Sequence, residues 1–224
     1  MINDNLNMIK GEKYDKTVKR LIDVIFSVIL LVLFLPVCFI LAILIKLDNL
    51  GPVFADTPDR VGRKGRLFKM HKFRSMIVHA HSILRQDPKF SSLYAKYKRN
   101  SYKLKHDPRV TGIGRFMRKH SLDEIPQLVN VLKGEMSLVG PRAYYPDELE
   151  NQQKKYPSTK SMVKKVLSIK PGITGYWQVS GRSEVNFDKR IAMDAVYVDN
   201  RSLWYDIKIL LKTPISMITG KGAV

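Results

Sequence analysis

The stretch VIFSVILLVLFLPVCFILAILI, residues 24–45, decides the fold of this chain. It is 22 residues long and carries no charged side chain. At about 1.5 Å per residue, a helix of this length just crosses a bilayer core of roughly 30 Å. Pro36 lies inside it, and a proline lacks a backbone donor and clashes with the carbonyl group four residues earlier, at Val32. We therefore expect two helical arms, residues 18–34 and 37–47, with a break at Pro36.

The charges on either side of this run predict its topology. Basic residues near membrane segments stay on the cytoplasmic side, so an unequal distribution would favour the export of one end. Here five basic residues precede the run and five follow it: Lys10, Lys13, Lys16, Lys19 and Arg20, then Lys46, Arg60, Arg63, Lys64 and Arg66. We expect a re-entrant helix-break-helix anchor that enters and leaves on the cytoplasmic face. A kinked helix that crosses the membrane is the alternative.

Composition sets the size and the partners of the rest of the chain. Residues 1–50 form the basic N-terminal segment and the anchor, which leaves residues 51–224 for one cytosolic catalytic domain. Lysine and arginine number 39 against 20 acidic residues, a formal charge of +19. Such a chain favours anionic partners, namely lipid headgroups, phosphorylated substrates or nucleic acid, and the apolar anchor favours membrane lipids over nucleic acid.

The remaining patterns predict an α+β, mostly helical, monotopic membrane protein. Two short β-compatible runs, 52–55 and 66–73, lie on either side of a glycine-containing turn, and residues 170–182 read as loop or strand. An amphipathic C-terminal helix is expected over 202–220, either packed on the domain or in contact with lipid. The other expected helices are 75–85, 91–105, 113–119, 121–133, 146–156, 159–168 and 186–198.

Two adjacent carboxylates, Asp123 and Glu124, are the strongest candidates for chemistry. Ser121 followed by Glu124 also fits a capping box, which would make the pair merely structural. The basic residues nearby favour the chemical interpretation: Arg115, Arg118, Lys119 and Arg142. Arginines can bind phosphate oxygens bidentately, while one carboxylate shares Mg²⁺ with the phosphates and the other attacks phosphorus.

Several motifs together resemble one family, the bacterial sugar transferases, also called monotopic phosphoglycosyl transferases or polyprenyl-phosphate sugar phosphotransferases. The resemblance spans nearly the whole chain and is highly specific. It rests on Lys19, Arg20 and Asp23 before the anchor, GPVF at 51–54, KFRSM at 72–76, SLDEIPQ at 121–127, NVLKGEMSLVGPR at 130–142 and KPGITGYWQVSGR at 170–182.

The resemblance implies a two-step reaction on the cytoplasmic face of the bacterial inner membrane. Asp123 would attack the β-phosphorus of a UDP-sugar and release UMP, and undecaprenyl phosphate would then accept the sugar phosphate. Glu124 would bind Mg²⁺. The product would initiate capsule, exopolysaccharide or related glycan assembly. Residues expected to complete the substrate site are Lys72, Arg118, Arg142, Arg182 and Asp194.

Two positions depart from the family pattern. Leu35 stands where a serine often precedes the anchor proline, and Ala143 stands where a second proline often follows the glycine-proline-arginine turn. The resemblance leaves open the identity of the sugar, for which a plain hexose is favoured, and the oligomeric state, with a homodimer among the alternatives. Direct attack by the lipid phosphate is an alternative mechanism. The alternative function is a basic, membrane-tethered binding protein for anionic lipid or nucleic acid.

Overall fold

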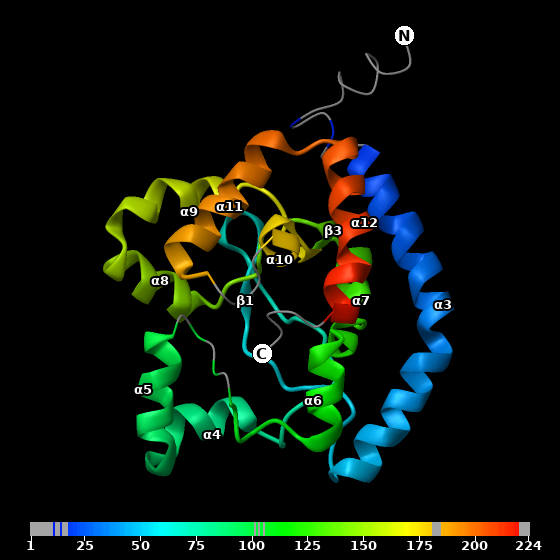
Figure 1. Cartoon of the computed structure of the whole chain (residues 1–224), viewed down its shortest axis with the longest axis vertical. Coiled ribbons are helices and arrows are strands. Elements are labelled where there is room, and N and C mark those ends of the chain that lie inside the picture. The colour runs from blue at the N-terminus through cyan, green and yellow to red at the C-terminus, as the bar shows by residue number, and fades with distance from the viewer. Residues whose placement is uncertain are drawn as a thin grey trace.

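The computed structural model of the chain describes residues 11, 14, 18–100, 102, 104, 106–180 and 185–219, and these residues are mostly helical (Figure 1). The α-helices are α3 (Lys19–Asp48), α4 (Ala80–Gln86), α5 (Ser91–Arg99), α6 (Gly112–Lys119), α7 (Gln127–Lys133), α8 (Pro146–Lys155), α9 (Lys160–Val166), α10 (Tyr176–Ser180), α11 (Phe187–Asn200) and α12 (Leu203–Thr219). The 3-10 helices are η2 (Arg63–Gly65), η3 (Pro88–Phe90), η4 (Leu122–Glu124) and η5 (Pro157–Thr159).

Four short strands form two separate pairs. Strands β1 (Arg60–Val61) and β2 (Leu67–Phe68) are antiparallel. Strand β2 lies within the predicted run 66–73, whereas β1 lies outside the predicted run 52–55, in which Phe54 forms an isolated antiparallel bridge to Phe73. Strands β3 (Ser137–Val139) and β4 (Gly172–Thr174) are parallel and join segments that are far apart in sequence. The main apolar core lies around β3, α7, α9 and α11 and includes Val131, Val139 and Ile191.

Helix α3 runs without interruption through Pro36, so the predicted break at that residue is wrong. The helix has 30 residues and therefore a length of about 45 Å. A proline inside a helix forfeits one hydrogen bond, and a helix can absorb that loss by bending while its other backbone groups stay paired. Figure 1 shows α3 curving along the edge of the molecule. In the described part of the chain it is the one helix long and apolar enough to cross a membrane.

The N-terminal end of α3 is bonded to the rest of the protein. The Arg20 guanidinium group donates to the carbonyl oxygens of Val131 (2.6 Å) and Leu132 (2.8 Å), at the end of α7 where helical carbonyls lack partners of their own. The buried Asp23 carboxylate accepts hydrogen bonds from Ser137 Oγ and from the backbone N–H of Leu138, both at 3.0 Å. These bonds fix the start of the apolar helix against β3.

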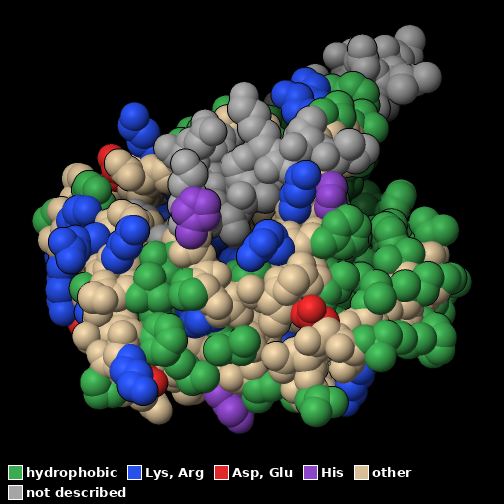
Figure 2. All heavy atoms as spheres, turned by 60° about the horizontal axis from the view of Figure 1, so that its bottom comes forward, with side chains coloured by type: hydrophobic (Ala, Val, Ile, Leu, Met, Phe, Trp, Pro, Cys, Tyr) green, Lys and Arg blue, Asp and Glu red, His purple; other side chains and the backbone are tan. Residues whose placement is uncertain are grey.

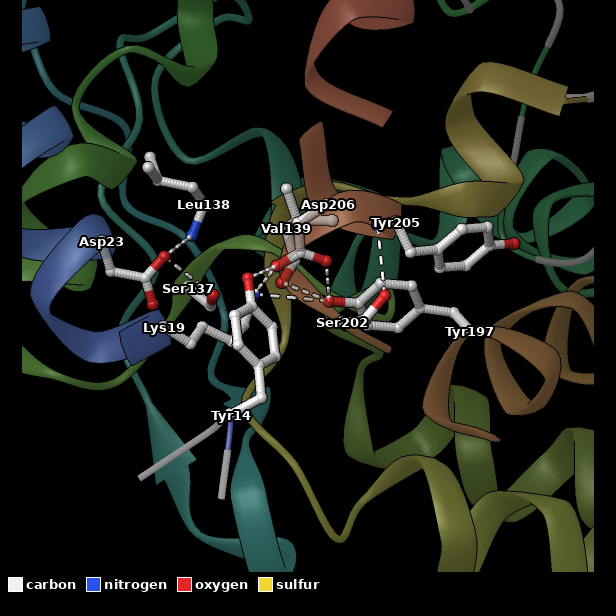
Figure 3. A network of polar contacts seen from close by, with 10 residues as sticks. All are labelled: Tyr14, Lys19, Asp23, Ser137, Leu138, Val139, Tyr197, Ser202, Tyr205 and Asp206. Atoms are coloured by element: carbon white, nitrogen blue, oxygen red, sulfur yellow. Dashed lines mark hydrogen bonds and ion pairs between the residues drawn. The ribbon is translucent and has the colours of Figure 1, made fainter. Parts of the chain in front are cut away.

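A buried polar network strengthens this junction (Figure 3). The Lys19 ammonium group forms an ion pair with the Asp206 carboxylate, which also accepts hydrogen bonds from the hydroxyls of Tyr14 (2.8 Å) and Tyr197 (2.7 Å). The pattern of α12 predicts Asp206 on the polar side of the helix, but the residue is buried. The reason is that the carboxylate pairs with Lys19, while the apolar Leu211 and Ile215 are exposed.

The C-terminal end of α3 packs against the same globular unit as its N-terminal end. Leu41 and Ile45 are buried in the main core, so the last turns pack on the domain. Beyond the helix, the guanidinium group of the buried Arg74 donates to the carbonyl oxygen of Pro52 at 2.6 Å and to Asn49 Oδ1 at 3.1 Å. Both ends of the long apolar helix are therefore held by one globular unit.

Most predicted helices are present, with shifted ends. The helix expected over 75–85 begins only at Ala80, because Met76 bridges to Val110 and His79 adopts a left-handed conformation with φ 56°. The helix expected over 121–133 is divided into η4 and α7. Residues 176–180, within a segment expected to be loop or strand, form α10.

Candidate active site

Asp123 and Glu124 lie in the single turn η4 between α6 and α7. Ser121 before them has φ 56°, and no hydrogen bond from its side chain caps the turn within the described residues, so the capping-box interpretation is wrong. A left-handed serine orients the chain so that the two acids follow in a tight turn and not on a regular helix. Asp123 is buried, with 6% of its surface exposed, whereas Glu124 is half-buried.

Lys72 joins the two carboxylates. Its ammonium nitrogen Nζ lies 2.6 Å from Glu124 Oε1 and 3.7 Å from Asp123 Oδ2. The neighbours of Lys72 fix its place: Phe73 N–H donates to the Asp123 carbonyl oxygen (2.9 Å), and His71 N–H donates to the buried Asn130 side chain of α7 (2.9 Å). The backbone on either side of Lys72 is thus bonded to η4 and to α7.

The environment shifts the pKa values of the two acids in opposite directions. Burial raises the pKa of Asp123, and the neighbouring Glu124 charge adds to this effect, while Lys72 and Arg118 oppose it. Burial also acts to raise the pKa of Glu124, but the charge and the hydrogen bond of Lys72 outweigh it and hold that pKa below its usual value. Asp123 is therefore the more basic of the two carboxylates.

Arg118 and Arg142 bring unpaired positive charge to the same turn. Each has a buried guanidinium nitrogen with no hydrogen-bond partner among the described residues: Nη1 in Arg118 and Nε in Arg142. Arg118 lies in the last turn of α6, which packs so closely that a Cβ atom on Gly114 would lie 1.9 Å from the carbonyl oxygen of Ser75. Buried donors without partners are costly, so these groups suit an anionic ligand.

The turn that carries Arg142 is held by the parallel strands. Gly140 N–H donates to the Thr174 carbonyl oxygen (2.9 Å), and Gly172 N–H donates to that of Pro141 (2.8 Å). A Cβ atom on Gly172 would lie 2.0 Å from the Gly140 nitrogen. These glycines are needed because the two backbones approach too closely for any side chain.

Asp194 of α11 supports the same turn. Its Oδ2 accepts hydrogen bonds from Arg142 N–H (3.2 Å) and from the Tyr144 hydroxyl (2.9 Å), while Oδ1 is buried and has no partner in the ranges that the structure describes. Burial raises the pKa of Asp194 to about 7, against the opposing effects of those two hydrogen bonds. Asp194 therefore supports Arg142 and is not part of the carboxylate pair in η4.

The structure brings together five of the predicted site residues and adds one that the sequence does not reveal. Lys72, Asp123, Glu124, Arg118 and Arg142 interact electrostatically or by direct contact, whereas Arg115 and Lys119 are exposed. Arg182 lies outside the described residues. Arg60 is the addition: its Nη1 donates to the Ala143 carbonyl oxygen at 3.0 Å, and its charge lowers the pKa of Glu124. Nothing in the motif spacing points to Arg60.

A divalent cation fits this donor set. The described residues contain no cluster of three or more histidine, cysteine, aspartate or glutamate side chains that could hold a metal alone. Mg²⁺ does not require one, because it prefers oxygen ligands and completes its shell with water and substrate phosphates. Glu124, half-buried and with a lowered pKa, lies in the field of Lys72 and Arg142 and has a carboxylate suited to share such an ion.

Comparisons with known proteins identify the family to which this chain is similar. The family model described as "Bacterial sugar transferase" matches residues 14–220. The "Undecaprenyl-phosphate galactose phosphotransferase" of Salmonella typhimurium is 42% identical over 95% of this chain and 43% of the relative. The "Exopolysaccharide production protein ExoY" of Rhizobium meliloti is 39% identical over 92% of this chain and 87% of the relative.

A third relative is the "UDP-glucose:undecaprenyl-phosphate glucose-1-phosphate transferase" of Escherichia coli, 35% identical over 93% of this chain and 42% of the relative. The chain spans less than half the length of the Salmonella and Escherichia proteins but most of the Rhizobium one. The match extends from the start of the apolar helix to the end of α12 and includes every described residue of the site. The chain therefore belongs to the bacterial sugar transferase family.

Proposed function

We propose that the protein transfers a sugar 1-phosphate from a UDP-sugar to undecaprenyl phosphate and so initiates exopolysaccharide or capsule assembly. The observation that carries the proposal is the pair Asp123 and Glu124 beside Lys72, with nitrogens of Arg118 and Arg142 nearby that have no hydrogen-bond partner in the described part of the chain. The printed names of the Salmonella and Escherichia relatives describe transfer to the same lipid carrier.

The chemistry has two displacements at phosphorus. In the first, an Asp123 carboxylate oxygen attacks the β-phosphorus of the donor, the bond to the bridging oxygen breaks, and its electron pair leaves with UMP. In the second, a phosphate oxygen of undecaprenyl phosphate attacks the same phosphorus. The Asp123 carboxylate then leaves unchanged, and a polyprenyl diphosphosugar forms.

The electrostatics favour Asp123 over Glu124 as the nucleophile. Lys72 binds Glu124 at 2.6 Å but lies 3.7 Å from Asp123, so Glu124 is the more strongly neutralised acid. The raised pKa of Asp123 makes its carboxylate a better electron donor once ionised, while the lowered pKa of Glu124 keeps it anionic for a metal ion. Neighbouring acids whose pKa values are pushed apart commonly divide the roles in this way.

The basic side chains and Glu124 serve the phosphates. The guanidinium groups of Arg118 and Arg142 bind non-bridging oxygens and stabilise the charge that develops on the leaving phosphate. Glu124, with the donor phosphates, would hold Mg²⁺, which neutralises charge on the diphosphate. Lys72 keeps both carboxylates in place and compensates their repulsion.

We further propose that α3 is a re-entrant anchor on the cytoplasmic face of the bacterial plasma membrane. Support comes from its two ends, since Arg20 and Arg74 bond both to one globular unit. A helix that crossed the bilayer would carry one end to the other side. Hydrophobic side chains gather on the edge of the molecule where α3 runs (Figure 2). Of the most apolar 18-residue stretch of α3, only 11% is buried inside the protein.

The reaction is tested by incubating the purified chain with UDP-sugars and undecaprenyl phosphate. We expect Mg²⁺-dependent release of UMP, which Asp123→Asn abolishes while Asp199→Asn, a matched change at an exposed position, leaves it intact. A labelled sugar phosphate should become trapped on Asp123 when the lipid acceptor is omitted. Full turnover in Asp123→Asn would exclude the proposed nucleophile, and UMP release without an adduct would favour direct attack by the lipid.

The anchor is tested by labelling single cysteines in a Cys38→Ser background. Cysteines at Lys16 and Leu50, one on each side of α3, should both react only when reagent reaches the cytoplasm. Reaction of either with an impermeant reagent from outside would instead show that α3 crosses the membrane.

A further inference from the structure

Arg190 of α11 lies over the same Trp177 ring as Arg142 and has no assigned role. Its residue is fully buried, and the guanidinium atoms Nε, Nη1 and Nη2 all lack hydrogen-bond partners among the described residues. The ion pair that it forms within the described ranges is long: Nη2 lies 3.5 Å from Oε1 of the fully buried Glu148. A buried charge with so few partners is costly for folding, and this cost calls for an explanation beyond stability.

The surroundings of Arg190 are the groups that hold Arg142. Both guanidinium groups lie over the Trp177 ring. The guanidinium carbon of Arg142 is 5.3 Å from the ring centroid, and that of Arg190 is 5.7 Å from it. The Tyr144 ring, whose hydroxyl bonds Asp194, lies 5.6 Å from Arg190. Arg190 therefore touches two of the aromatic rings through which the Arg142 turn is supported.

Charge connects the same groups. Burial acts to lower the pKa of Arg142, but the Glu148 carboxylate is the main opposing charge, and that pKa is held above its usual value. Arg190 pairs with the same carboxylate. Two guanidinium groups thus lie over one indole ring, and one carboxylate pairs with Arg190 and acts electrostatically on Arg142. Arg190 is itself fully buried, so any effect that it has on a ligand must pass through a neighbouring side chain.

We propose that Arg190 is a positioning residue that, through Trp177 and Glu148, sets the orientation of the Arg142 guanidinium for the diphosphate of the donor. This inference rests on the proposed function. It predicts that the planar guanidinium group at residue 190 is needed for donor use, because an ammonium group cannot stack on the indole in the same way. It also predicts that the contributions of Arg190 and Arg142 to kcat/KM are not independent.

A double-mutant cycle tests the proposal. Arg190→Lys should lower kcat/KM for the UDP-sugar by about tenfold or more, measured as UMP release, whereas adding it to Arg142→Lys should lower kcat/KM by less than about twofold further. Arg109→Lys is the matched control, because Arg109 is equally buried but bonded to Asp107 and to the Ala80 carbonyl oxygen. It should lower the Tm without changing kcat/KM.

If Arg190→Lys does not fold, Trp177→Leu serves instead, since it keeps both arginines and removes the shared ring. It should lower kcat/KM by the same factor of about ten in the wild-type background and by less than about twofold in the Arg142→Lys background. Equal factors in both backgrounds, or an unchanged kcat/KM with wild-type UMP release, would overturn the inference. A wild-type protein that releases no UMP from any UDP-sugar would instead refute the proposed function.

Discussion

Replacing Asp194 by asparagine should change how the stability of the protein depends on pH. Burial places the pKa of Asp194 at about 7 in the folded state, against 3.8 for the free group. The folded protein therefore holds this proton more tightly than the unfolded chain. The stabilisation from Asp194 is fully present below about pH 4 and is lost as the pH rises through 7.

The size of the effect follows from the two pKa values. They differ by about 3, and each pKa unit corresponds to about 1.4 kcal/mol, so the loss between pH 4 and pH 8 is about 4 kcal/mol. An asparagine side-chain oxygen can still accept from Arg142 N–H and Tyr144, and it never ionises. The cost of placing an amide group at the Oδ1 position, which has no partner among the residues described, does not depend on pH.

Thermal unfolding of the detergent-solubilised protein at pH 4 to 8 measures this difference. For a chain of this size, about 4 kcal/mol corresponds to roughly 10 °C in Tm. The Tm of Asp194→Asn relative to the wild type should therefore rise by roughly 10 °C over this range, whereas Asp199→Asn, at an exposed carboxylate, should run parallel to the wild type. A Tm difference for Asp194→Asn that stays constant within about 2 °C would refute the assignment of a raised pKa to Asp194.

Three further changes probe other parts of the structure. Gly114→Ala should lower the free energy of unfolding by about 1–3 kcal/mol and reduce UMP release, because its Cβ would meet the Ser75 carbonyl oxygen. Gly112→Ala is the control: its Cβ meets no backbone atom, so neither quantity should change, and chemical denaturation of both variants measures the difference. Arg74→Met should destabilise the protein by about 3 kcal/mol, since the carbonyl groups after α3 lose their donor, and a Tm equal to the wild type would contradict this. Glu124→Gln should raise the Mg²⁺ concentration needed for half-maximal UMP release by about tenfold, and an unchanged titration would exclude Glu124 as a ligand.

Local sequence was sufficient for the elements whose signals are local. The apolar run predicted α3, Gly134 marked the end of α7 with a positive φ of 79°, and the adjacent acids Asp123 and Glu124 marked the turn of the candidate site. The effect of Pro36 was not predictable, because whether a proline ends a helix or bends it depends on what packs along the helix. The capping box predicted at Ser121 is wrong because Ser121 takes a left-handed backbone conformation. The surrounding turn imposes that conformation, and the local sequence does not reveal it.

The sequence by itself determined the apolar helix, the basic charge and the acid pair, because each is a property of neighbouring residues. Only the tertiary structure placed Lys19 against Asp206, 187 residues away, Arg60 against the Ala143 carbonyl oxygen, and Arg142 and Arg190 over the same Trp177 ring. Such pairs leave no local pattern, since burial first brings the partners together. Once buried, each charge must find a partner or a ligand, and that requirement selects the contacts.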